Sequence, residues 1–195
     1  MRGLIKTKMT LPEKYSQHAY EIEEAIVFLV TRMLESGYNP KPVIIHSVRM
    51  GVNLYNHNYE LDIVKAAILH DIIEDSDTTV AEIEKRFGEN VAQIVQAVTF
   101  DYNIGDRAAQ GIECIQRCLN YGRDALIVKA ADMLENSSYI VDPASSKAFS
   151  DFYVAEMRYL ANVSHPIIGN ESIWQELSQQ CQKLETLLQQ IDTQQ

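Results

Sequence analysis

The feature that most constrains the fold of this 195-residue chain is the spacing of its apolar residues, which recur at intervals of three and four. This is the period of an α-helix, and few segments show the alternation that is typical of a strand. Gly and Pro are sparse, at 8 and 5 residues, so helices can run without frequent interruption. The pattern predicts an all-α protein, a helical bundle that forms a single domain over residues 1–195.

Capping residues and chain breakers delimit the individual helices. Thr79 and Glu82 have the spacing of a capping box, and Gly88 is typical of a helix C-terminus. Residues 143–146 break the chain, so we expect a core at about 20–140 followed by C-terminal helices within 147–192. The expected helices lie at about 11–37, 42–56, 61–75, 79–88, 90–100, 108–120, 124–136, 149–163 and 171–191, with Leu11-Pro12 opening the first.

The charge balance narrows the classes of partner. The formal net charge is -10, which argues against nucleic-acid binding because that function needs a basic face. The charge does not argue against a small anionic substrate, since a bound divalent metal can reverse the sign of the charge inside one pocket.

The cysteines and the hydropathy bear on the compartment. Cys114, Cys118 and Cys181 lack the paired spacing of a disulfide framework and are expected to be buried, reduced thiols. No apolar run approaches the ~20 residues that span a bilayer, and the N-terminus lacks the apolar segment of a signal peptide. We therefore expect a cytoplasmic protein that does not act at a membrane.

Ionisable side chains interrupt the most apolar of the expected helices. Residues 66–75 read AAILHDIIED, and apolar side chains surround most of this helix, which is typical of a buried one. Ionised carboxylates in a core are costly unless they are paired or coordinate a metal. At about 100° per residue, four ionisable residues fall within one arc of roughly 140° and can converge on one cleft: His70, Asp71, Glu74 and Asp75.

Two further apolar helices carry the same anomaly. His46 lies in the stretch KPVIIHSVRMGVNL, with Arg49 about one turn further on. Asp132 lies in DALIVKAADMLEN, and Lys129 and Asn136 share its face at spacings of three and four. Each residue alone has an ordinary explanation as a core or surface side chain. The three helices together indicate one site.

The residue types at these positions predict metal chemistry. Two imidazoles and two carboxylates suit Mn²⁺, Fe²⁺, Co²⁺ or Zn²⁺ better than Ca²⁺, and they lack the thiolates of most structural zinc sites. Four protein ligands leave positions for water and substrate on an octahedral metal, which would lower the pKa of a bound water and polarise a phosphoryl oxygen. The expected ligands are His46, His70, Asp71 and Asp132.

The order of these ligands along the chain, a His, then His-Asp, then Asp, resembles that of the HD-domain phosphohydrolases. The similarity is closest to the hydrolase domain of the RelA/SpoT alarmone enzymes and to their stand-alone small hydrolases. ILHDIIEDSDTTVAEIEKRFGENVAQIVQAVT, at residues 68–99, is similar to that family's HD…ED segment, its FG turn and its V-T ending. VKAADMLEN, at residues 128–136, is similar to its K-x-A-D-x-x-x-N stretch.

The resemblance implies an all-helical HD-type domain that uses Mn²⁺ and removes the 3′-pyrophosphate of ppGpp or pppGpp, with a metal-bound hydroxide as the attacking group. It assigns Glu74 and Asp75 to the acidic pair that positions or activates the attacking water. Lys129 and Asn136 match the family's K and N. With Arg49, they are the residues that we expect to bind the small anionic nucleotide.

Departures from the family pattern leave the substrate open. Met133 stands where the family usually has Arg or Lys, and the segment before His46, FLVTRMLESGYNPKPVIIH, supplies only Arg32 and Lys41. Because a pyrophosphate needs cations, one alternative is an HD-type nucleotidase with a less charged substrate. Another is a metal-binding sensor module without catalysis, although a purely structural site has no need of Glu74 and Asp75.

The last expected helix presents an apolar stripe. Its spacing of four and three resembles a coiled-coil seam, but it spans only about two heptads. The stripe therefore either covers the core of its own domain or pairs with a second subunit in a homo-oligomer. Its members are Leu177, Cys181, Leu184, Leu188 and Ile191.

Overall fold

The computed structural model describes residues 13–38, 42–139 and 147–192, with side chains over 17–38, 42–139 and 147–190. These ranges contain no strand, which confirms the predicted all-α fold. The N-terminal segment, the Leu11-Pro12 helix start and the break at 143–146 lie outside the described residues. The helices are α1 (Glu13–Ser36), α2 (Val43–Asn56), α3 (Leu61–Leu69), α4 (Ile72–Asp75), α5 (Val80–Phe87), α6 (Glu89–Val98), α7 (Arg107–Tyr121), α8 (Arg123–Asn136), the 3-10 turn η1 (Ser137–Tyr139), α9 (Lys147–Ile168) and α10 (Ser172–Asp192).

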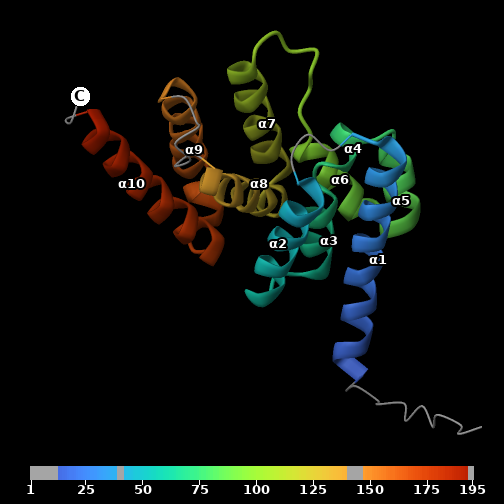
Figure 1. Cartoon of the computed structure of the whole chain (residues 1–195). Coiled ribbons are helices and arrows are strands. Elements are labelled where there is room, and N and C mark those ends of the chain that lie inside the picture. The colour runs from blue at the N-terminus through green and yellow to red at the C-terminus, as the bar shows by residue number, and fades with distance from the viewer. Residues whose placement is uncertain (1–12, 39–41, 140–146, 193–195) are drawn as a thin grey trace, which may run out of the picture.

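Helix α8 is the centre of the arrangement. It contacts α2, α3, α6, α7, α9 and α10, and in Figure 1 it runs between the α9–α10 pair and the group formed by α2, α3 and α6. Every side chain from 125 to 133 is buried as a result. A helix covered on all sides is apolar in most proteins, so Lys129 and Asp132 in this stretch must find their partners inside the protein.

The predicted helix over 61–75 is interrupted at His70 and Asp71, and this expectation of one continuous helix is wrong. In a continuous helix the Ala67 carbonyl would accept from the Asp71 N–H. Here the His70 ring nitrogen Nδ1 lies 2.9 Å from that carbonyl oxygen and competes for it. Asp71 adopts φ -90° and ψ -2°, and its own carbonyl begins α4 by accepting from the N–H groups of Glu74 and Asp75. The two halves of the HD dipeptide therefore lie at a joint between two helices.

The capping predicted for the next helix is confirmed. The Thr79 hydroxyl accepts from the Glu82 N–H at 3.3 Å, and the Glu82 carboxylate accepts from the Thr79 N–H at 2.9 Å. Gly88 ends this helix at φ 95°, a left-handed conformation that favours glycine. Helix α9 is longer than predicted, because it continues past Val163 to Ile168 and includes Pro166.

The C-terminal stripe packs on its own domain. Leu177, Cys181 and Leu184 are buried, and Leu188 packs against the core while partly exposed. Helix α10 contacts α9 and α8, and the side chain of Ile191 lies outside the described residues. This is the packing expected of a helix that covers its own core. Pairing with a second subunit stays a prediction.

The state of the cysteines and the apolar content of the helices follow the expectations from the sequence. Cys114, Cys118 and Cys181 are free and buried, as predicted. Among the helices of the described residues, none is both long and apolar enough to cross a membrane.

Close contact between α2 and α3 leads to a prediction about stability. A Cβ atom at Gly51 would lie 2.4 Å from Cγ1 of Ile68, which is fully buried. Gly51→Ala should therefore lower the free energy of unfolding by about 1–3 kcal/mol, the usual cost of overpacking. Urea denaturation would measure it. Gly105→Ala is the matched control, because nothing lies within 4 Å of its Cβ position, and an equal loss in both variants would contradict the prediction.

Candidate metal centre

Three of the predicted metal ligands meet at one point. His46 comes from α2, His70 follows the last residue of α3, and Asp132 comes from α8. One donor atom from each lies within 4.8 Å of the others. The Nε2 atoms of the two histidines are 3.2 Å apart, and Asp132 Oδ1 lies 3.4 Å from His46 Nε2 and 3.6 Å from His70 Nε2. All three side chains are buried.

These distances fit a single metal ion. Two ligands bound at about 2.0–2.2 Å to the same ion lie roughly 3–3.6 Å apart, which matches the separations of the three donor atoms. The bond from His70 Nδ1 to the Ala67 carbonyl needs its proton on Nδ1, which leaves the lone pair of Nε2 facing the other donors. Imidazole nitrogen and carboxylate oxygen are the donor types of transition-metal sites.

The electrostatics of the centre also favour a cation. Burial opposes a positive charge on His70, but Asp71 and Asp132 outweigh it and raise the pKa of His70 to about 10. Burial opposes a negative charge on Asp132, but Lys129 and the two histidines hold the pKa of Asp132 well below its usual range. A buried pocket that stabilises positive charge so strongly is suited to a metal ion.

Asp71, the fourth predicted ligand, lies beside this group. Its Oδ1 atom is 3.0 Å from His70 Nε2, and its side chain is buried. Asp71 is not one of the three residues whose donor atoms lie mutually within 4.8 Å. The structure thus brings three of the four predicted ligands together and places the fourth against one of them.

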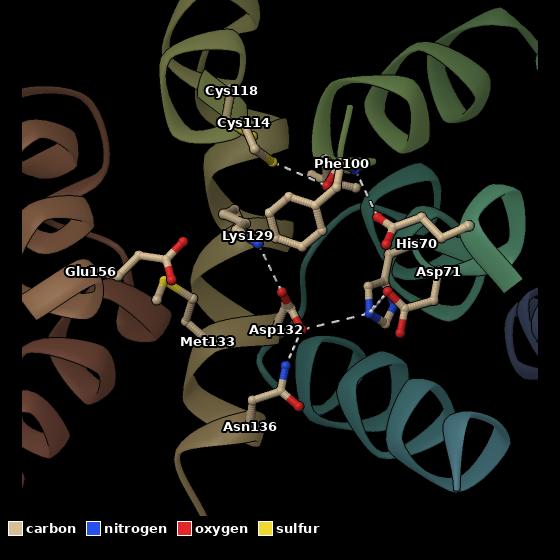
Figure 2. A network of polar contacts seen from close by, with 12 residues as sticks. His70, Asp71, Phe100, Cys114, Cys118, Lys129, Asp132, Met133, Asn136 and Glu156 are labelled. Atoms are coloured by element: carbon tan, nitrogen blue, oxygen red, sulfur yellow. Dashed lines mark hydrogen bonds and ion pairs between the residues drawn. The ribbon is translucent and has the colours of Figure 1, made fainter. Parts of the chain in front are cut away.

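Lys129 and Asn136 both bind Asp132 (Figure 2). The Lys129 amine donates to Asp132 Oδ2 at 3.0 Å, and the Asn136 amide donates to Oδ1 at 2.6 Å. The amine also lies 4.6 Å from the ring centre of Phe100. Burial opposes its charge, but Asp132 outweighs burial and raises the pKa of Lys129 well above its usual value. These two residues, predicted to bind substrate, orient the Asp132 carboxylate.

The acidic pair occupies the rim of the same centre. The Glu74 carboxylate accepts from the Phe100 N–H at 2.8 Å and from the Tyr102 hydroxyl at 2.7 Å. Burial and the nearby Asp71 raise the pKa of Glu74, while these two hydrogen bonds oppose the shift. Asp75 lines the cavity beside Glu74. The loop that follows α6 therefore fixes the position of Glu74.

Arg49 lies elsewhere. Its guanidinium pairs with Glu135 and is half exposed. It is not among the residues that line the cavity at the metal centre. The structure thus places Arg49 in the surface ion pair that is the ordinary role of such a residue.

A cavity of about 320 Å³ reaches the centre at Asp132, which lines it together with Asp71. It contains residues that the sequence analysis missed, among them Tyr38, Arg107, Gln110, Tyr153 and Glu156. Glu156 could have been found, because it interrupts the apolar stretch around Tyr153 and Met157 just as Asp132 interrupts α8. Arg107 had no comparable signal, since a cation at the start of a helix is common.

Comparisons with known proteins agree with this geometry. The fold and the centre together define an all-helical domain with a buried His-and-Asp site for a divalent metal. The model of the HD domain family matches residues 29–153 of the chain. The chain belongs to the HD domain family.

Two relatives are similar in sequence to part of this chain. The chain is 34% identical over 125 residues to a guanosine-3′,5′-bis(diphosphate) 3′-pyrophosphohydrolase of Aquifex aeolicus, in an alignment that covers 63% of this chain and 18% of that protein. It is 38% identical over 100 residues to the zebrafish (Danio rerio) enzyme of the same name, MESH1, covering 49% of this chain and 53% of that one. The alignments thus span about half or less of these relatives.

A solved structure supports the fold. It is that of a metazoan orthologue of SpoT, described as hydrolysing ppGpp and playing a role in starvation responses. It superposes with a TM-score of 0.71 at 18% identity, over 89% of this chain and 97% of the other.

The Tyr102–Glu74 hydrogen bond leads to a prediction. Tyr102→Phe removes a donor to the charged form of Glu74, so the pKa of Glu74 should rise further above its usual value. The free energy of unfolding at pH 7 should fall by about 1 kcal/mol, because the lost bond is charge-assisted but its donor is largely exposed. Carboxyl NMR titration of Glu74 and urea denaturation measure the two effects. Tyr20→Phe on the exposed face of α1 is the control, and an unmoved Glu74 pKa would contradict the prediction.

Proposed function

We propose that this chain is a metal-dependent phosphohydrolase that removes the 3′-pyrophosphate of ppGpp or pppGpp. The observation that carries the proposal is the meeting of His46, His70 and Asp132 beside a cavity that Asp132 lines together with Glu74 and Asp75. A site that only holds a structural metal has no need of two further acids beside it, so the acidic pair favours an enzyme over a sensor module. The names of the relatives supply the substrate.

In this proposal the ion is Mn²⁺, and its ligands are His46, His70, Asp71 and Asp132. The protein is proposed to act in the cytoplasm. Such an ion supplies Lewis-acid polarisation of a phosphoryl oxygen and lowers the pKa of water. Lys129 and Asn136 keep the Asp132 carboxylate oriented. Since removal of such supporting partners typically costs 10- to 100-fold in affinity or activity, their part is substantial.

Glu74 and Asp75 act on the attacking water. The raised pKa of Glu74 makes it a better proton acceptor than an ordinary glutamate, because the proton-transfer driving force increases as the pKa approaches the working pH. The bonds from Phe100 and Tyr102 hold the carboxylate in place as the proton moves.

A second candidate is hydrolysis of a nucleoside monophosphate. It is favoured by the charges around the cavity, which is lined by two basic side chains, Arg107 and Lys129, and by five acidic ones. Lys129 is already bonded to Asp132, and Met133 lines the cavity where a cation would help a polyphosphate. A substrate with fewer phosphates needs fewer cations.

Product analysis with Mn²⁺ distinguishes the two candidates. The proposal expects ppGpp to yield GDP and pyrophosphate. Inertness towards ppGpp, together with release of phosphate from a nucleoside monophosphate, would establish the nucleotidase instead.

The ligand assignment predicts a loss of metal and activity together. A ligand that binds only the folded protein raises the free energy of unfolding by about 2.7 kcal/mol at 100 times its Kd. Excess Mn²⁺ should therefore raise the melting temperature of the wild type but not of His46→Ala, and a chelator should abolish activity. His57→Ala at the end of the same helix is the matched control, since His57 binds Glu176 outside the cavity. A metal-free preparation that stays fully active would contradict the assignment.

The role of the acidic pair predicts a different pattern. Glu74→Gln and Asp75→Asn should each keep the metal and lose rate, by ~10²–10⁴-fold if the residue is a general base. Metal analysis and single-turnover rates measure both quantities. Glu113→Gln, which alters an exposed partner of Arg117, should change neither. If metal is lost in step with rate, the substituted residue is a ligand.

A further inference from the structure

Glu156 is a buried acid that the proposed hydrolysis does not use. It comes from α9, is 7% exposed and lines the cavity. Its Oε2 atom is buried and meets no hydrogen-bond partner among the described residues. Its Oε1 atom has one long contact, 3.4 Å, with the guanidinium of Arg107, which is itself half exposed. A buried carboxylate with so few donors is costly unless a ligand completes it.

The facing helix leaves room for this carboxylate. A Cβ atom at Gly111 of α7 would lie 1.9 Å from Glu156 Oε1, so a side chain at 111 would push the carboxylate out of its position. A glycine inside a helix is unfavourable relative to alanine. The packing explains the glycine at position 111, because it allows Glu156 to lie close to α7.

The position of Glu156 within the cavity restricts its ligand. In Figure 2 its carboxylate points towards α8, and in this view Met133 lies between it and Asp132. The same cavity is thus lined both by Asp132 of the metal centre and by Glu156. A carboxylate repels phosphate, so a nucleotide whose phosphates lie at the metal must present to Glu156 a part that donates hydrogen bonds.

We propose that Glu156 is a specificity-determining residue that accepts two hydrogen bonds from the base of the nucleotide, and that it selects guanine. The inference rests on the proposed function for the placement of the phosphates. Guanine carries two adjacent donors on its pairing edge, N1–H and the N2 amino group, which match the two oxygens of one carboxylate. Adenine offers an amino group beside an acceptor nitrogen, so one of its two edge atoms would face the carboxylate with a lone pair. Hypoxanthine keeps N1–H but lacks the amino group.

The test compares three substrates that differ only in the base: the 3′,5′-bis(diphosphates) of guanosine, inosine and adenosine. A polar site that hydrogen-bonds its substrate discriminates strongly against analogues that leave it unpaired. We expect kcat/KM of the wild type to favour guanine over adenine by about 10²–10⁴-fold, with inosine between them. Glu156→Gln, which replaces one acceptor by a donor, should reduce this preference to about tenfold or less while leaving the adenosine substrate nearly unaffected.

Two further variants sharpen the test. Gly111→Ala should reduce the preference in the same way, because it displaces the carboxylate without removing it. Asp151→Asn is the matched control on α9, where an exposed acid pairs with Lys147, and it should keep the full preference. Thermal unfolding of each variant verifies that it is folded, and Gly111→Ala decides the question if Glu156→Gln does not fold.

Binding separates this inference from the proposed function. Calorimetric titration with GDP, IDP and ADP needs no turnover. If no bis(diphosphate) is hydrolysed but GDP binds more tightly than ADP only while Glu156 is intact, the proposed function fails and the base selection stands. If the three bis(diphosphates) are hydrolysed with equal kcat/KM, or if Glu156→Gln keeps the guanine preference, the base selection is overturned while the hydrolase function stands.

Discussion

The structure depends on a charge placed in the centre of its most covered helix. Asp132 lies on α8, which six other helices contact, and at that depth an isolated carboxylate would be prohibitively costly. Lys129 and Asn136 on the same helix bind it from one side, and His46 and His70 face it from α2 and the end of α3. These interactions fix the positions of α2, α3 and α8 relative to one another. The packing of the bundle and the geometry of the metal centre therefore depend on the same contacts.

The joint between α3 and α4 serves the same centre. In an uninterrupted helix, the side chains of His70 and Asp71 would point about 100° apart, although still within the arc that can face one cleft. The break at these two residues lets His70 Nε2 and Asp71 Oδ1 approach to 3.0 Å. It also starts α4 so that Glu74 reaches the loop after α6, where Phe100 and Tyr102 bind it. The joint between the two helices thus brings several functional side chains to one cavity.

The sequence predicts the helices and the three ligands His46, His70 and Asp132 because both can be recognised from residues close together in the chain. Helical period and capping are read within a few residues, and an ionisable group such as His46 or Asp132 in an apolar stretch is visible without knowing its neighbours. The break at His70 is not visible in this way, since it depends on a side chain competing for a particular carbonyl. The partner of Arg49 depends on the packing of α2 against α8, and the space that Gly111 leaves for Glu156 depends on the packing of α7 against α9. Neither contact can be read from the periodicity.

The charges around the cavity impose an order on binding. Asp71, Glu74, Asp75, Asp132 and Glu156 line it against only Arg107 and Lys129, so a polyphosphate approaching the empty centre meets net negative charge. Opposite unit charges about 4 Å apart interact by roughly 4 kcal/mol at an effective dielectric constant of 20, and like charges repel to the same extent. A divalent cation at His46, His70 and Asp132 would offset most of this negative charge and would concentrate positive charge at the metal centre, while leaving Glu156 unneutralised. Because the added positive charge lies at the metal centre, the phosphates are drawn there, and in the proposed arrangement Glu156 faces the base.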